Sequence, residues 1–347
     1  MQACPPLHPS GRLREKAMPA AAEPVIALLT AMDEDVPPGL ETLSGQARLI
    51  HTRTVEELRD ALAEADILLV TDFNTDVVER AWPAARKVSW VHATSAGVDR
   101  LLFPALRESD VPLTNARGIF DRPIAEYVLG LILLYAKDLH TTLALQREHR
   151  WHHRDTERIE GQRVLVVGAG SIGRQIARAC GAMGMQVTGI ASRDRDSDPD
   201  FQAVYSNDRL TELLPDQDYV VIAAPLTPAT EGLFDAGLFR RMATHARLIN
   251  IGRGPIVRTD DLVAALRAGE LAGAALDVFE DEPLPADHPL WDLDNVVISH
   301  HMAGDVVGWR RALSEQFIAN FHCWRQGEPL LNQVDKGRGY VPPSPGT

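Results

Sequence analysis

Short apolar runs alternate with helical patterns in the first third of the chain. The runs span residues 25–29, 47–51, 67–70 and 88–92, and residues 55–64 between two of them have a helical pattern. Strands that alternate with helices are typical of a parallel sheet covered by helices. The pattern therefore predicts a first α/β domain over residues 24–116.

A long helical pattern follows at about residues 123–147, with apolar residues on most of its turns. A helix on the surface of one domain buries a single apolar stripe, and this segment offers more apolar surface than that. We therefore expect it to pack between domains or between subunits.

A second series of apolar runs begins at residues 163–167, which lead directly into a glycine-rich turn and another helical pattern. Further strand-like runs occur at residues 186–190, 219–223, 247–251, 274–278 and 295–298. Their number predicts a doubly wound sheet. The predicted fold class is thus α/β, with two doubly wound parallel-sheet domains.

The composition indicates a soluble globular protein and argues against several kinds of partner. Of the 347 residues, 45% are apolar and 24% are charged, and the formal net charge of −13 offers no basic surface for nucleic acid. No apolar run approaches the roughly 20 residues that a membrane span requires. Three widely separated cysteines indicate reduced thiols in a cytoplasmic protein. Residues 1–23 lack a signal-peptide centre and are expected to form a disordered extension.

The glycine-rich turn has the spacing of a dinucleotide-binding fingerprint. Gly168 permits a tight turn after the strand, Gly170 lets the backbone approach a pyrophosphate, and Gly173 lets the helix pack closely on the strand. Ser171 and Ile172 open the helix, whose free N–H groups and positive dipole favour phosphate. The alternative is a glycine-rich turn without a ligand. The strand before the turn and the helix after it argue against this interpretation.

The end of the next predicted strand bears on which nicotinamide cofactor binds. An acidic residue that would grip both ribose hydroxyls of NAD is absent there, and Ser192 and Arg193 stand in its place. A small polar residue followed by arginine suits the 2′-phosphate of NADP, so we favour NADP over NAD. In the alternative, Arg193 is only solvated and Asp194 binds the ribose.

Four motifs in order along residues 25–340 resemble the D-isomer-specific 2-hydroxyacid dehydrogenase family, which includes glyoxylate/hydroxypyruvate reductases. The motifs are Ser95-Ala96-Gly97-Val98-Asp99, the fingerprint, Asn250-Ile251-Gly252-Arg253-Gly254, and Asp277 to Pro283 followed by His300 to Gly304. The resemblance implies a Rossmann cofactor domain (residues 117–304) inserted into a flavodoxin-like substrate domain (residues 24–116 and 305–340).

Three residues at the family's catalytic positions match the needs of 2-oxo acid reduction. Arg253 can hold the substrate carboxylate and polarise its carbonyl, and His301 can donate a proton to the carbonyl oxygen. Glu282 can orient and support that imidazole. His300 stands where the family usually has proline, and it is a weaker rival to His301.

The resemblance also implies contacts around the reacting atoms. The backbone of Ala96 and Gly97 resembles the family's cradle for the substrate carboxylate. Asp277 resembles the residue that receives the nicotinamide carboxamide. The remaining cofactor contacts that the resemblance implies are Pro225, Thr230, Ile251, His301 and Gly304.

The function that the sequence predicts is reduction of a small 2-oxo acid to the D-2-hydroxy acid with NAD(P)H. Glyoxylate and hydroxypyruvate are the leading substrates, and bulkier acids remain open. No metal is expected, because the histidines of residues 149–153 lack a carboxylate at usable spacing. The resemblance implies a homodimer with residues 123–151 at its contact. The rival function is a nicotinamide-sensing, corepressor-like binding protein of the same fold.

Overall fold

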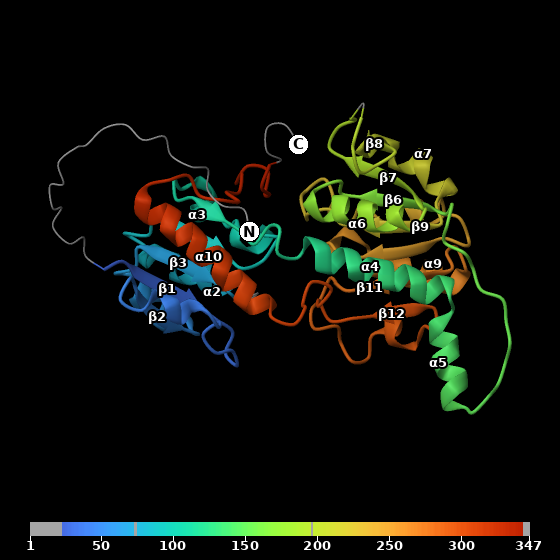
Figure 1. Cartoon of the computed structure of the whole chain (residues 1–347), viewed down its shortest axis with the longest axis horizontal. Helices are drawn as coiled ribbons and strands as arrows, with labels where there is room; N and C mark the ends of the chain where they lie inside the picture. The colour runs from blue at the N-terminus through green and yellow to red at the C-terminus, as the bar shows by residue number, and fades with distance from the viewer. Residues whose placement is uncertain (1–22, 73–74, 196, 343–347) are drawn as a thin grey trace.

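The chain folds into two α/β lobes that lie side by side, each built around a parallel sheet (Figure 1). The computed structural model describes residues 23–72, 75–195 and 197–342. The extension predicted for residues 1–23 therefore lies, except for Glu23, outside the described residues.

The first lobe has a five-stranded sheet in the order β2-β1-β3-β4-β5, with every pair parallel. The strands are β1 (Val25–Leu29), β2 (Arg48–Thr52), β3 (Ile67–Val70), β4 (Trp90–Ala93) and β5 (Leu113–Thr114). The helices are α1 (Val55–Leu62), α2 (Asp76–Ala81) and α3 (Pro104–Glu108). The sequence pattern does not predict β5, because two residues are too few to show a period.

The second lobe has a seven-stranded parallel sheet in the order β12-β11-β10-β9-β6-β7-β8. The strands are β6 (Arg163–Val167), β7 (Gln186–Ala191), β8 (Ala203–Ser206), β9 (Tyr219–Ile222), β10 (Arg247–Asn250), β11 (Gly273–Leu276) and β12 (Val296–Ile298). Its helices are α6 (Ser171–Ala182), α7 (Leu210–Leu213), α8 (Ala236–Phe239) and α9 (Thr259–Ala268). The predicted α/β class with two parallel sheets is confirmed, although the edge strand β8 was not predicted.

The long helix expected at residues 123–147 is two helices. α4 (Asp121–Ala136) ends before Asp138, whose φ of 48° breaks the helical path, and α5 (Leu139–Arg147) continues after a bend of 64°. Arg154 pairs with the Asp138 carboxylate and holds this corner. In the described part of the chain no single helix is long and apolar enough to cross a membrane. By length and composition alone, the bent pair α4 and α5 passes that test when taken together.

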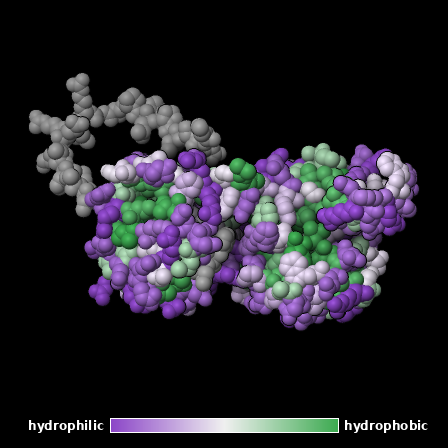
Figure 2. Space-filling model, turned by 90° about the horizontal axis from the view of Figure 1, so that it is seen from below, coloured by the Kyte–Doolittle hydropathy of each residue, from purple (hydrophilic) through white to green (hydrophobic). Residues whose placement is uncertain are grey.

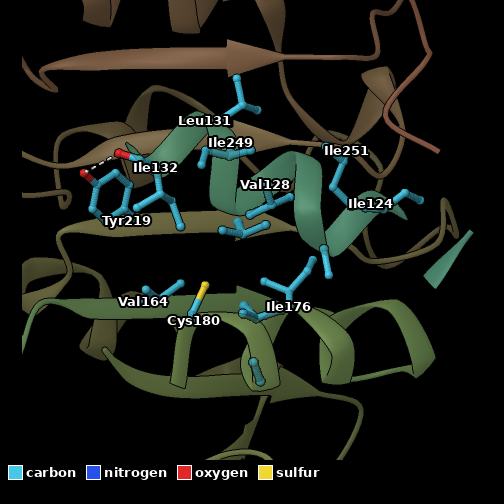
Figure 3. Close-up of a cluster of buried hydrophobic side chains, with 14 of the residues drawn as sticks. Ile124, Val128, Leu131, Ile132, Val164, Ile176, Cys180, Tyr219, Ile249 and Ile251 are labelled. Atoms are coloured by element: carbon cyan, nitrogen blue, oxygen red, sulfur yellow. Dashed lines mark hydrogen bonds between the residues drawn. The ribbon is translucent and has the colours of Figure 1, made fainter. Parts of the chain in front are cut away.

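α4 is the central helix of the second lobe's core. Figure 3 shows its side chains, among them Val128 and Ile132, lying between the sheet and α6, which contributes Ile176. The Tyr219 hydroxyl donates a hydrogen bond to the Ile132 carbonyl oxygen (3.4 Å), which ties β9 to this helix. α5, by contrast, has no buried residue and extends away from the lobe (Figure 1).

The last helix, α10 (Trp309–Gln326), returns to the first lobe (Figure 1). The rings of Trp90 on β4 and Phe317 on α10 stack with centroids 5.1 Å apart. Beyond α10, the N–H of Val334 donates to the carbonyl oxygen of Leu113 on β5. These contacts support the proposed division, in which residues 305–340 join residues 24–116 and residues 117–304 form the other domain.

His92 lies in the core beneath α10 and is completely buried. Its Nδ1 is 2.7 Å from the hydroxyl of Thr114, which also accepts a hydrogen bond from the Trp90 indole N–H. Its Nε2 has no partner among the described residues. Burial therefore lowers the pKa of His92 from 6.5 to about 3, because a charged imidazole here would lose its hydration without gaining a counterion.

This burial predicts acid-dependent stability. Between pH 6.5 and about 3, His92 is protonated in the unfolded chain but neutral in the folded chain. The free energy of unfolding should therefore fall as the pH drops from 6.5 toward 3. This residue should lower the free energy of unfolding by about 1.4 kcal/mol for each pH unit below 6.5. At pH 5 its contribution is a loss of about 2 kcal/mol. Urea unfolding of wild type and His92→Asn at pH 7 and pH 5 measures it. If both proteins lose the same stability, the assignment is wrong.

Candidate active site

A cavity of about 270 Å³ lies between the lobes, at the carboxyl ends of strands from both sheets. Figure 2 shows the narrow waist between the two lobes from below. The lining residues with ionisable side chains are Asp72, Asp99, Arg100, Arg253, Glu282 and His301. Ligands of open α/β sheets bind at this edge, because polar loops and free backbone groups gather where parallel strands end.

Glu282 and His301 form a hydrogen-bonded pair in this cavity. The Nδ1 of His301 lies 3.0 Å from Oε2 of Glu282, and the other carboxylate oxygen accepts from the N–H of Phe279 (2.9 Å). His301 follows β12 in a left-handed conformation (φ 56°), with its N–H donating to the carbonyl oxygen of Asp277 (2.7 Å). Nδ1 is thus the ring nitrogen that is directed to the carboxylate.

Opposing effects set the pKa of Glu282. Burial raises it, but the hydrogen bond with His301, the Phe279 N–H and the nearby charge of Arg100 lower it by more in sum. The pKa of Glu282 is therefore below its usual value, so the carboxylate stays ionised at neutral pH. An ionised carboxylate stabilises the protonated imidazole that a general acid requires.

Arg253 enters the cavity from a turn that two glycines make possible. Asn250, buried at the end of β10, accepts from the N–H of Gly252 and donates to the carbonyl oxygen of Arg253 (both 3.1 Å). A Cβ on Gly252 would lie 2.8 Å from the Ala224 carbonyl oxygen, and one on Gly254 only 1.8 Å from the backbone of Phe279. Any larger residue at either position would displace the turn.

The guanidinium of Arg253 lies against the loop of Ala96 and Gly97, and a Cβ on Gly97 would be 1.8 Å from its Nη2. Their carbonyl oxygens accept from Asn115 and Ser95, whereas neither N–H has an acceptor within the described ranges. These N–H groups are thus available to an anion beside Arg253. Their role as a carboxylate cradle remains a proposal.

Asp277 has a second role that the sequence did not indicate. It is 3% exposed, and it accepts hydrogen bonds from the Ser299 hydroxyl (2.6 Å) and from the N–H groups of Met302 (3.0 Å) and Ala303 (2.9 Å). These bonds fix the loop that carries His301. Contact with a carboxamide remains a proposal for this residue.

The fingerprint has the shape that a dinucleotide requires. Gly168 has φ of 112°, and a Cβ there would lie 2.6 Å from the backbone of Ala223. A Cβ on Gly173 would lie 2.1 Å from the Gly168 carbonyl oxygen, whereas one on Gly170 would meet nothing within 4 Å. The turn is therefore closely packed on its inner side and open at Gly170, beside the N-terminus of α6, where Ser171 and Ile172 lie. This fits a bound pyrophosphate.

The ribose end of the predicted cofactor site carries arginine side chains. Ser192 and Arg193 follow β7 and are exposed, and Arg193 has no ion-pair partner among the described residues. One carboxylate oxygen of Asp194 accepts from the N–H of Ser206 (2.6 Å). Arg195 donates to the Ala169 carbonyl oxygen of the fingerprint (3.1 Å) and was not singled out from the sequence.

Buried carboxylates hold Arg195 there. Asp198, whose side chain is 1% exposed, pairs with both Arg195 and Arg174 (2.9 and 2.8 Å), and Asp200 pairs with Arg174 and Arg178. Three guanidinium groups share two carboxylates, which leaves the group one positive charge in excess.

The other expected residues occupy loops near the same strand ends. The Thr230 hydroxyl donates to the Pro225 carbonyl oxygen (2.7 Å) and closes their loop. Ile251 is buried after β10, and a Cβ on Gly304 would lie 2.7 Å from the Phe120 ring. His300 is exposed and does not line the cavity. Over the described ranges, no group of three His, Cys, Asp or Glu side chains could hold a metal ion.

Comparison with known proteins gives consistent similarities. Residues 129–303 match the family model for the NAD-binding domain of D-isomer specific 2-hydroxyacid dehydrogenases. The glyoxylate reductase of Thermofilum pendens is 32% identical over 81% of this chain and 84% of its own length. The glyoxylate/hydroxypyruvate reductase A of Escherichia fergusonii is 31% identical over 82% and 95%. A crystal structure of a D-isomer specific 2-hydroxyacid dehydrogenase from Xanthobacter autotrophicus, in complex with NADPH and MES, has a TM-score of 0.77 and 30% identity, covering 92% of this chain and all of that one.

The packing of the fingerprint predicts that two glycines of α6 differ in how well they tolerate substitution by alanine. Gly173→Ala forces a methyl group against the Gly168 carbonyl oxygen, so it should lower the free energy of unfolding by about 1–3 kcal/mol and weaken nicotinamide binding. Gly181→Ala, in the same helix, meets nothing within 4 Å and should be neutral or stabilise by up to about 1 kcal/mol. Chemical unfolding and NADPH fluorescence titration test both. Equal behaviour of the two variants would contradict the packing argument.

Proposed function

The chain belongs to the D-isomer specific 2-hydroxyacid dehydrogenase family, and from this premise we propose that it reduces glyoxylate, hydroxypyruvate or a similar small 2-oxo acid to the D-2-hydroxy acid with NADPH. The observation that carries the proposal is that the Glu282–His301 pair and Arg253 line the same cavity. A site that only sensed nicotinamide would not need a proton donor supported by a carboxylate.

In the proposed reaction the chain's residues bind the acid and move one proton. Arg253 and the N–H groups of Ala96 and Gly97 hold the carboxylate, and the guanidinium also polarises the carbonyl group. The bound nicotinamide supplies a hydride. Nε2 of His301 gives a proton to the carbonyl oxygen, and the ionised Glu282 stabilises the imidazolium before the transfer.

The preference for NADP over NAD rests on the charges at the ribose end. Arg193 is exposed, and Arg195 lies against the fingerprint, where it donates to the Ala169 carbonyl oxygen. A 2′-phosphate would gain charge-assisted hydrogen bonds from these groups. Asp194, which would instead favour the ribose of NAD, is turned toward the Ser206 N–H through one carboxylate oxygen. Family members of known structure include one bound to NADPH.

We also propose that the protein is a homodimer. α5 has no buried residue, Leu139 and Leu143 are 44% and 51% exposed, and Trp151 beyond it is fully exposed. Apolar side chains on a helix that projects from its lobe would become buried against a second subunit. Residues 123–151 are the segment proposed for this contact.

The first test is the loss of NADPH absorbance with a panel of 2-oxo acids. Wild type should reduce glyoxylate or hydroxypyruvate, and His301→Ala should lower kcat/KM by about 100-fold or more because the proton donor is lost. The adjacent exposed residue provides a matched control, since His300→Ala should retain the wild-type rate.

Two outcomes would contradict the proposal. Full activity of His301→Ala would remove this residue from the reaction. Tight binding of NADPH with no turnover of any acid would favour the sensing, corepressor-like function.

The cofactor preference is tested by titration of NADPH and NADH. Arg193→Ala should weaken NADPH binding by about ten-fold or more and leave NADH binding unchanged, because only NADPH carries the 2′-phosphate. Arg240→Ala removes an exposed positive charge at the end of α8 in the same lobe and should affect neither. Equal weakening of both cofactors by Arg193→Ala would refute the assignment.

A further inference from the structure

An ion pair crosses the cavity from one lobe to the other. Nε of Arg253, which follows β10 in the second lobe, lies 3.0 Å from Oδ1 of Asp99, which follows β4 in the first lobe. Both side chains are about three-quarters buried (25% and 21% exposed). The pair therefore lies in a partly desolvated place, where a charge-assisted hydrogen bond holds a side chain more firmly than it does on an open surface.

The hydrogen bonds of the guanidinium determine which of its edges can meet a ligand. Of its five N–H groups, the one on Nε is directed to Asp99, and one on Nη1 donates to the Gly252 carbonyl oxygen (2.8 Å). A carboxylate can bind arginine in a bidentate manner along the Nε/Nη2 edge or along the Nη1/Nη2 edge. Because Asp99 occupies the N–H of Nε and the Gly252 carbonyl oxygen occupies one N–H of Nη1, a ligand carboxylate meets the remaining N–H groups on Nη1 and Nη2.

The backbone of the first lobe lies against the guanidinium of Arg253. A Cβ on Gly97 would lie 1.8 Å from Nη2 of Arg253, so the guanidinium lies directly over this glycine. The N–H groups of Ala96 and Gly97, which lack acceptors in the described ranges, belong to the same loop as Asp99. Asp99 thus holds the guanidinium beside the N–H groups with which it would share a carboxylate.

We propose that Asp99 is a positioning residue, which orients Arg253 through the cross-lobe ion pair so that its Nη1/Nη2 edge and the Ala96–Gly97 backbone form one carboxylate clamp. Because one partner comes from each lobe, the clamp is complete only when the lobes are as close as they are here. The inference rests on the proposed function for the identity of the ligand, a 2-oxo acid, but not for the geometry of the clamp.

The charge of Asp99 makes the proposal sharply testable, because the opposite role predicts the opposite sign. A carboxylate that only competed with the substrate for Arg253 would weaken substrate binding, and its removal would lower KM. A carboxylate that positions Arg253 strengthens binding, and its removal raises KM.

The experiment compares Asp99→Ala and Asp99→Asn with wild type in steady-state kinetics with glyoxylate or hydroxypyruvate. We expect Asp99→Ala to raise KM by about ten-fold or more, with a smaller change in kcat and unchanged NADPH binding. Asp99→Asn keeps an oxygen acceptor for Nε and should recover most of the lost affinity. Asp60→Ala removes an exposed carboxylate from α1 in the same lobe and should leave KM unchanged.

A second measurement does not depend on turnover. Oxalate, a small dicarboxylate probe, is titrated by calorimetry into the NADPH complexes of wild type and Asp99→Ala, and about ten-fold weaker binding by the variant is expected. Equal or tighter oxalate binding by the variant, an unchanged or lower KM, or no oxalate binding by wild type would overturn the proposal. Absence of turnover in wild type with normal oxalate results would instead reject the proposed reaction and leave the clamp standing.

Discussion

All the strands in both sheets are parallel, and the position of the site follows from this constraint. Parallel strands end at a common edge, so the residues that follow them gather there. Asp99 follows β4, Arg253 follows β10, Glu282 follows β11 and His301 follows β12. Since the edges of the two lobes border one cavity, residues far apart in sequence come within hydrogen-bond distance without any long excursion of the chain.

Buried polar side chains then fix the geometry of the loops at these edges. Asp277 holds the loop of His301 with three hydrogen bonds, and Asn250 holds the turn of Arg253 with two. A buried carboxylate or amide that lost these partners would be left without hydration, so the loops have little freedom to move. The loops of Arg253 and His301 are therefore held by Asn250 and Asp277, which do not themselves line the cavity.

The sequence predicted most strands to within two residues, and it failed where tertiary contacts decided. β1, β3 and β6 have the predicted bounds, whereas β5 and β8 were missed. The interruption between α4 and α5 was also missed, because the left-handed Asp138 is stabilised by Arg154 from a later loop. No local pattern reveals a contact of this kind.

The sequence by itself determined the fold class and the kinds of residue in the site, because apolar periodicity follows from burial and glycine spacing from the close approach of the backbone. Only the tertiary structure decided which groups meet. It brought Asp99 to Arg253 and Asp198 to Arg174, and it showed that Asp277 organises a loop. Ion pairs between distant segments depend on how the folded chain packs. The sequence around one partner therefore does not predict which residue is the other.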